Sequence, residues 1–233
     1  MKYKVIAFLP CCKGSERVKE KNTRLFSGIE GGLTKIKLDQ LIACPEIDEI
    51  TVSTDDTVVM SLAEIAAKDT NKPLHIKERP PHLATSSTST DALIKHVPEI
   101  ISHGVILWIH VTEPFVDNKT YSSAIRKFWE TTDQNKHDSL MAVNELRTFL
   151  WNENRPVNYD RNKEKWPRTQ TLPIWYEVNS AFFIAPIETY IMESDRIGIN
   201  PYMFELRFPE SVDIDTEDHF YFAEWMWRYR NKK

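Results

Sequence analysis

The amino-acid sequence predicts one α/β domain built on a doubly wound, mostly parallel β-sheet. Short apolar runs of strand length alternate with longer segments of helical periodicity along most of the 233 residues, a pattern typical of parallel sheets covered by helices. The apolar runs are continuous, as expected for strands buried on both faces. With 41% hydrophobic and 27% charged residues, a chain of this length can bury a substantial core without disulfide bonds.

The first predicted strand, residues 4–9, leads into a cationic loop. We expect Pro10 to end this strand, since proline has no N–H for a sheet ladder. Hydroxyls and cations placed after a strand suit a bound polyphosphate, although an ordinary basic surface loop would have the same composition. Neither GxxxxGK[ST] nor GxGxxG is present. The polar segment that would bind the anion carries Gly14, Ser15, Arg17, Lys19, Lys21 and Asn22.

The next elements continue the alternation. Residues 33–44 have apolar side chains at helical spacing and precede Pro45, so they predict a helix. Residues 47–53 then form a short strand. Asp55 and Asp56 follow it, and carboxylates at this point cap the free N–H groups of a helix, which we expect over residues 58–67.

Four further strands and three further helices complete the predicted pattern. Residues 104–111 are the strongest strand pattern and suit a central position, and their C-terminal end is where α/β sheets bind ligands. Serine and threonine residues 85–90 precede a predicted helix as N-cap candidates. The remaining strands are predicted at residues 74–77, 139–143 and 176–184, and the remaining helices at residues 91–101, 119–130 and 217–229.

Residues 144–173 interrupt the pattern. The segment is polar and rich in turn residues, but it carries rings such as Phe149, Trp151 and Trp166, which are too frequent for a disordered linker. We interpret it as an ordered subregion inserted into a single domain that spans residues 1–233.

Two aspartates near the C-terminus form a candidate metal site. In an extended chain, Asp213 and Asp215 point to the same side, and two carboxylates so placed suit a Mg²⁺ ion between them. Capping of the last helix explains Asp215 or Thr216, but it does not explain both aspartates.

Composition excludes several classes of function. A net charge of −4 argues against a general nucleic-acid binder. The three cysteines do not form a disulfide framework, and Cys11 and Cys12 lack zinc-ligand spacing. No apolar run approaches the roughly 20 residues that span a bilayer, and the N-terminus has no signal-peptide pattern. We therefore expect a cytoplasmic protein without membrane or nucleic-acid partners.

The motifs resemble those of the acylneuraminate cytidylyltransferases, also called CMP-sialic acid synthetases. The loop after the first strand resembles the family pattern IPARxxSxRxxxKN, with Cys12 in place of the first arginine. Later segments resemble the family motifs STDD, RPxxLA, QPTSPL, RRQDLP and ENGAI, and the closest match is SVDIDTED, at residues 211–218, to DIDTxxD.

The resemblance implies a nucleotide-diphospho-sugar transferase-like, Rossmann-type fold and the transfer of a cytidylyl group from CTP to an acidic sugar. It implies that residues 144–173 pair two subunits in a homodimer. Lys21, Arg17 and Asp213 would be catalytic, with Asp213 and Asp215 holding Mg²⁺. Ser15, Lys21, Asn22, Arg79, Ser86 and Ser87 would bind the nucleotide, and His110, Thr112, Arg168, Gln170 and Asn179 would bind the acceptor. A non-sugar acceptor such as a phosphonate, and a nucleotide-binding homologue that has lost catalysis, remain alternatives.

Overall fold

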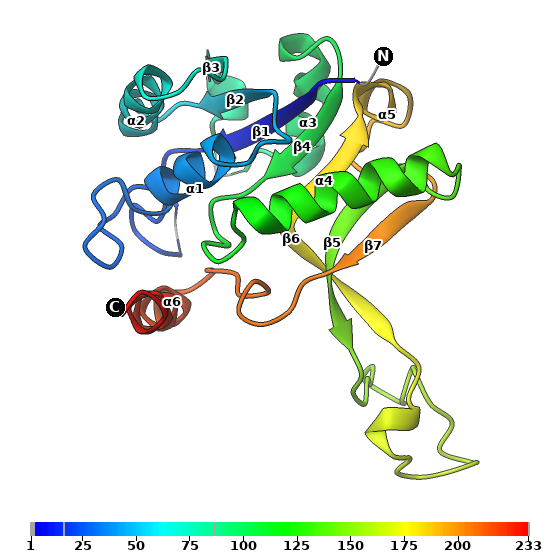
Figure 1. Cartoon of the computed structure of the whole chain (residues 1–233). Helices are drawn as coiled ribbons and strands as arrows, with labels where there is room; N and C mark the ends of the chain where they lie inside the picture. The colour runs from blue at the N-terminus through cyan, green and yellow to red at the C-terminus, as the bar shows by residue number, and fades with distance from the viewer. Residues whose placement is uncertain (1–2, 16, 86, 233) are drawn as a thin grey trace.

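The protein is described from a computed structural model that defines residues 3–15, 17–85 and 87–232. Within these residues, seven strands form one sheet in the order β3-β2-β1-β4-β6-β5-β7 (Figure 1). Neighbouring strands pair in parallel except around β6, which is antiparallel to both β4 and β5. The strands are β1 (Val5–Cys11), β2 (Glu49–Thr54), β3 (Leu74–Glu78), β4 (Val105–Ile109), β5 (Ser139–Leu146), β6 (Trp175–Pro186) and β7 (Pro201–Glu205).

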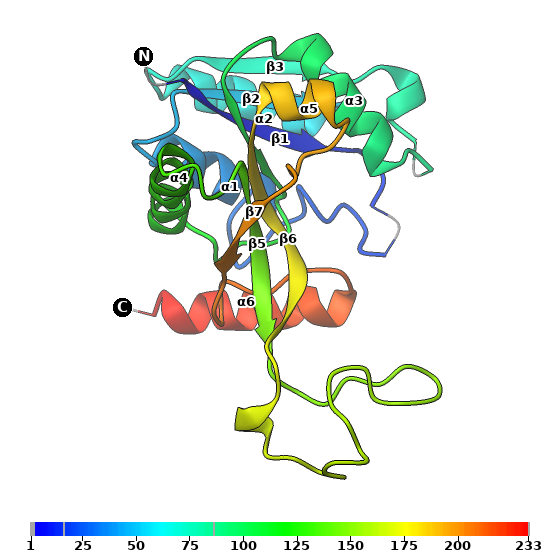
Figure 2. The same ribbon diagram turned by 90° about the vertical axis from the view of Figure 1, so that its right-hand side faces the viewer.

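Helices cover both faces of the sheet. One hydrophobic cluster joins the sheet to α1, α2, α4 and α6, and a second joins its other face to α3 and α5 (Figures 1 and 2). This is the doubly wound arrangement that the sequence predicts. The helices are α1 (Gly32–Ile42), α2 (Thr57–Lys68), α3 (Thr90–Ile100), α4 (Asn118–Asp133), α5 (Ile187–Met192) and α6 (Glu217–Arg230), with short 3-10 turns at Pro81–Leu83 and Thr169–Thr171.

The switch in strand order lies between β1 and β4. The chain winds outward from β1 to β2 and β3, then returns to place β4 on the other side of β1. Loops that leave the C-terminal ends of β1 and β4 therefore diverge and leave a crevice, which is where ligands bind in sheets of this kind. The cationic loop follows β1, and residues 110–117 follow β4.

The prediction that Pro10 ends the first strand is wrong. The strand β1 continues to Cys11, and Pro10 is in register with Ser53 of β2. The ladder between β1 and β4 ends earlier, at Phe8. Beyond Phe8 the strand has one neighbour, and a proline is tolerated where a strand has a free edge.

The structure confirms the predicted cap of α2 and decides between the two candidates for the cap of α6. The Asp56 side chain accepts a hydrogen bond from the Val58 N–H (2.8 Å) and caps α2. At α6 the cap is Thr216, whose hydroxyl accepts from the His219 N–H (3.2 Å). Asp215 is therefore free of the capping role that the sequence left open for it.

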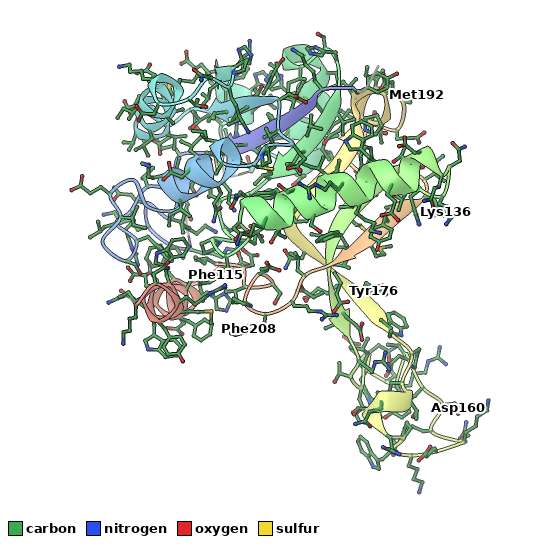
Figure 3. The ribbon with its side chains drawn as sticks, in the orientation of Figure 1. Phe115, Lys136, Asp160, Tyr176, Met192 and Phe208 are labelled. Atoms are coloured by element: carbon green, nitrogen blue, oxygen red, sulfur yellow. The ribbon has the colours of Figure 1, made fainter. Side chains whose placement is uncertain are left out.

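Residues 147–174 leave the sheet as an excursion between β5 and β6. Figure 1 shows the excursion below the body of the molecule, and Figure 3 shows Tyr176 near its base and Asp160 within it. Its rings pack on one another, with Phe149 at 5.2 Å from Tyr159 and 5.4 Å from Trp166 between centroids. The segment is thus ordered by its own aromatic contacts. No helix in the described part of the chain is long and apolar enough to cross a membrane.

Candidate active site

The cationic loop after β1 is closed at its neck by hydrogen bonds. The Asn22 side-chain amide donates to the Cys12 carbonyl (3.1 Å), and the Asn22 carbonyl accepts from the Thr34 N–H (2.8 Å) at the start of α1. The Lys13 N–H donates to the Asp55 carboxylate (2.9 Å) after β2. The loop, which includes half-buried Ser15, is thereby fixed against the C-terminal edge of the sheet.

Lys21 connects this loop to the aspartate segment. Its Nζ donates a hydrogen bond to the backbone carbonyl of Ile214 (2.8 Å), the residue between the two aspartates. Partial burial lowers the pKa of Lys21, while the nearby carboxylates of Asp213 and Asp215 act to raise it. A cation of this kind, partly desolvated and next to two carboxylates, is well placed to bind a phosphate group.

The two aspartates have different surroundings. Burial raises the pKa of Asp213, and the neighbouring Asp215 adds to the effect. Its Oδ1 is buried and has no hydrogen-bond partner among the described residues. The Asp215 Oδ1 instead lies 2.7 Å from the Arg17 guanidinium, and both side chains are substantially exposed. The structure therefore brings together three of the predicted catalytic and metal residues around Lys21.

This carboxylate pair fits a Mg²⁺ ion. The buried Asp213 Oδ1 is an acceptor without a donor, and a like charge nearby makes joint ionisation unfavourable unless a cation joins the pair. No group of three or more metal-ligating side chains occurs among residues 3–15, 17–85 and 87–232. A small number of protein ligands is typical of Mg²⁺, because the ion takes the rest of its octahedral coordination from water and substrate phosphates.

The loop after β4 is held in place from α1. Lys37 is fully buried, and its Nζ donates to the carbonyls of Glu113 (3.0 Å) and Val116 (3.1 Å) and to the Tyr121 hydroxyl (2.8 Å). The Thr112 carbonyl in turn accepts a hydrogen bond from the Ile214 N–H (3.0 Å). The loop thus carries the aspartate segment and fixes Asp213 opposite Lys21.

Glu113 is a buried carboxylate of this loop. Its Oε2 accepts from the Thr112 hydroxyl (2.9 Å), whereas its Oε1 has no partner among the described residues. Burial raises the pKa of Glu113 and lowers the pKa of Lys37. Sequence reasoning singled out neither Glu113 nor Lys37 as a functional residue. The available signal for Lys37 was its position between apolar residues of α1.

Of the predicted nucleotide residues beyond the loop, Arg79 lies at the ends of β2 and β3. Arg79 is 4% exposed, and its guanidinium donates to the Ser53 carbonyl (2.8 Å). In this conformation Arg79 joins the ends of the two strands. Ser87 is exposed in the turn before α3, with its hydroxyl 3.0 Å from that of Thr85. Ser86 lies outside the described residues.

The predicted acceptor residues divide into two groups. His110 and Thr112 follow β4, and Asn179 is buried on β6, where its amide donates to the Ser211 carbonyl (3.3 Å) two residues before Asp213. These three lie near the aspartate segment. Arg168 and Gln170 are exposed on the excursion, which Figure 1 shows below the body. One chain does not bring them to the site.

The chain matches a known protein family over most of its length. The model of a family described as cytidylyltransferase matches residues 6–226. The chain belongs to the cytidylyltransferase family. The family resemblance predicted from the sequence motifs is thereby confirmed.

Curated relatives include two bacterial enzymes named N-acylneuraminate cytidylyltransferase. The one from Streptococcus agalactiae serotype V is 24% identical over 231 residues, and the one from Escherichia coli O18:K1:H7 is 23% identical over 244 residues. The alignments cover 93% and 100% of this chain but 52% and 54% of those proteins. The chain therefore spans about half the length of these curated relatives.

Solved structures of cytidylyltransferases share the fold. A CMP:2-keto-3-deoxy-manno-octonic acid synthetase complexed with CTP has a TM-score of 0.65 at 12% identity, with 97% of this chain and 99% of that chain covered. A 4-diphosphocytidyl-2C-methyl-D-erythritol synthase from Anaerococcus prevotii has a TM-score of 0.64 at 10% identity, with 97% and 96% covered. At these identities the likeness confirms the α/β fold class alone.

Proposed function

We propose that this family member transfers the cytidylyl group of CTP to a hydroxyl of an acidic 2-keto sugar and releases pyrophosphate. The observation that carries the proposal is the hydrogen bond from Lys21 to the peptide between Asp213 and Asp215 (2.8 Å). It joins a phosphate-binding loop to a carboxylate pair suited to Mg²⁺. The names of the curated relatives and the CTP bound to one structural relative support the nucleotide and the class of acceptor.

The side chains around Lys21 suit a reaction that depends on charge neutralisation and positioning. The acceptor oxygen forms a bond to the α-phosphorus as the bond from that phosphorus to the bridging oxygen breaks. Pyrophosphate leaves with the bonding electrons, and the hydroxyl proton passes to solvent. Lys21 and Arg17 offset negative charge on the phosphates throughout. Asp213 and Asp215 would hold a Mg²⁺ ion, which would supply further charge neutralisation and favour ionisation of the attacking hydroxyl.

The direct test is pyrophosphate release with CTP, Mg²⁺ and a panel of acceptors. The panel contains N-acetylneuraminate, 2-keto-3-deoxy-manno-octonate and, for the non-sugar alternative, a hydroxyalkyl phosphonate. We expect release with at least one acidic 2-keto sugar and none without an acceptor. Release with the phosphonate alone would overturn the sugar assignment, and no release with any acceptor would favour a homologue that has lost catalysis.

We predict that CTP raises the melting temperature more than UTP, ATP or GTP at equal concentrations. A ligand that binds the folded state stabilises it according to concentration relative to the dissociation constant, so selective binding gives a selective shift. Differential scanning fluorimetry with Mg²⁺ measures it. Equal shifts for all four nucleotides would contradict the assignment to CTP while leaving the fold unaffected.

We also predict a homodimer formed through the excursion. Trp175 and Tyr176 at its base are 43% and 47% exposed, and apolar rings gathered on a projecting segment suit a twofold interface with a second copy. Arg168 and Gln170 would then reach the site of the partner. Light scattering should give about twice the chain mass of 27.3 kDa.

A double variant tests the role of these rings in the dimer. Trp175→Ser with Tyr176→Ser should shift the equilibrium toward monomer. The control Trp225→Ser removes a ring that is 60% exposed on α6 and should leave the mass unchanged. A wild-type protein that is monomeric at micromolar concentration would refute the dimer.

A further inference from the structure

Arg196 is a half-buried cation that lies on aromatic rings. It belongs to the segment between α5 and β7. Its guanidinium carbon lies 3.7 Å from the ring centroid of Phe183 and 5.1 Å from that of Trp108, two residues that are in register on β6 and β4. Stacking on these rings fixes the plane of the guanidinium.

Arg196 has no ion-pair partner among the described residues. Its neighbour Asp195 uses a carboxylate oxygen to accept the Arg196 backbone N–H (2.6 Å) and does not pair with the guanidinium. Burial lowers the pKa of Arg196, because removing a charge from water is unfavourable unless an opposite charge compensates it. An anion next to the guanidinium would supply that compensation.

His110 and Tyr190 are the polar groups around Arg196. The His110 Nε2 accepts from the Trp108 indole N–H (2.8 Å), and an Arg196 N–H lies 3.3 Å from the same nitrogen. Burial and the nearby cations lower the pKa of His110 to about 3, so the ring is neutral and its proton is on Nδ1. The Tyr190 hydroxyl is buried and has no partner among the described residues. Tyr190 also interacts electrostatically with Arg196, so a buried hydroxyl without a partner accompanies a guanidinium without an ion-pair partner.

His110 places this cluster on the acceptor side of the site. It follows β4 directly and precedes Thr112, whose carbonyl binds the aspartate segment at Ile214. The charges of both Lys21 and Arg196 act on the His110 ring, so the ring lies within electrostatic range of the phosphate-binding lysine and of the unpaired arginine.

We propose that Arg196, with His110, binds the carboxylate of the acceptor and selects acidic over neutral sugars. The inference rests on the proposed cytidylyl transfer and names the residue that determines its acceptor class. A guanidinium donates two parallel hydrogen bonds to a carboxylate, and the stacked rings hold it ready to do so. A neutral acceptor leaves the cation unpaired. The site therefore disfavours neutral sugars as well as favouring acidic ones.

The test compares Arg196→Gln and Arg196→Lys with the wild type in steady-state kinetics, using the active acceptor from the panel. Loss of one partner of a partly buried charge pair should raise the acceptor KM of Arg196→Gln by about 30-fold or more, while the CTP KM stays within about twofold of the wild type. Arg196→Lys keeps the charge and should recover part of the loss. The control Arg207→Gln removes an exposed arginine that pairs with Glu205 and should change neither KM.

A binding measurement separates this inference from the proposed reaction. Melting temperatures are measured without CTP, in the presence of N-acetylneuraminate, its C1 methyl ester, 2-keto-3-deoxy-manno-octonate or pyruvate. We expect the carboxylates, but not the ester, to stabilise the wild type and Arg207→Gln, and to stabilise Arg196→Gln much less. Carboxylate binding that depends on Arg196 without any turnover would support the inference and contradict the reaction.

Two results would overturn the inference. One is an Arg196→Gln variant that melts like the wild type and keeps its acceptor KM, which would leave the reaction intact and reduce Arg196 to a packing role. The other is a wild type that no carboxylate in the set stabilises.

Discussion

Replacing Lys21 with alanine should reduce the rate of cytidylyl transfer by roughly 10²–10³-fold, the scale of removing one electrostatic stabiliser from a transition state. Lys21 connects the two halves of the site, since its Nζ lies 2.8 Å from the Ile214 carbonyl and it interacts electrostatically with both aspartates. Its charge is partly desolvated, so it acts on bound phosphates more strongly than an exposed lysine does.

The Lys21 measurement is steady-state pyrophosphate release at saturating CTP and acceptor. The matched control is Lys19→Ala, which removes an exposed lysine from the same loop and should retain most of the wild-type rate. Melting temperatures of both variants establish that they are folded. A Lys21→Ala protein that turns over at nearly the wild-type rate would contradict the assignment of this loop to the phosphates.

Replacing either aspartate with asparagine should abolish most turnover and change its dependence on Mg²⁺. Asparagine keeps the shape of the side chain but removes the charge that would hold the metal. The control Asp218→Asn removes an exposed carboxylate from the first turn of α6 and should preserve turnover. If Asp213→Asn and Asp215→Asn both retain wild-type rates across a Mg²⁺ titration, the metal site lies elsewhere.

The same variants should differ in stability without metal. The pKa of Asp213 is raised in the folded protein, chiefly by burial, so the folded state binds this proton more tightly than the unfolded state. The stability linked to Asp213 is therefore present below the unfolded pKa of the carboxyl group and is lost as pH rises through the folded value. Asp213→Asn should melt at a higher temperature than the wild type at neutral pH, and the difference should shrink as pH is lowered.

Asp215→Asn provides the comparison for this stability effect. Asp215 is more exposed and pairs with Arg17 (2.7 Å), and exposed pairs contribute little to stability. Its replacement should leave the melting temperature of the metal-free protein nearly unchanged at either pH. An equal gain in both variants would indicate general charge repulsion and would contradict the distinct burial of Asp213.

The sequence predicted the elements that depend on local pattern. Residues 104–111 read as a central strand because residues 105–109 form a continuous apolar run. The pair Asp55 and Asp56 was recognised as a helix cap because capping is a local interaction. Pro10 was misjudged because the cost of a missing N–H depends on where the ladder of the neighbouring strand β4 ends. The elements α5 and β7 were missed, since one is a single short helix and the other a half-exposed edge strand that begins with proline.

The candidate site was predictable where residues close in sequence act together. Lys21 and the aspartate pair were identified from spacing and from the family motifs. Arg196 was not, because its contacts depend on the register that sets Trp108 beside Phe183 and on the path of an irregular segment. Lys37 was missed for a similar reason, as its role appears only when the loop after β4 folds back onto α1.

The most direct test of the central claim is identification of the reaction products. The wild type is incubated with CTP, Mg²⁺ and each acidic 2-keto sugar of the panel, and the mixture is examined by mass spectrometry with pyrophosphate quantified in parallel. We predict a CMP-linked sugar and pyrophosphate in equal amounts, with neither formed from UTP or by Lys21→Ala at a comparable rate. Pyrophosphate formed without a CMP-linked sugar, or equal product from UTP, would contradict the assignment of this chain as a CTP-dependent transferase.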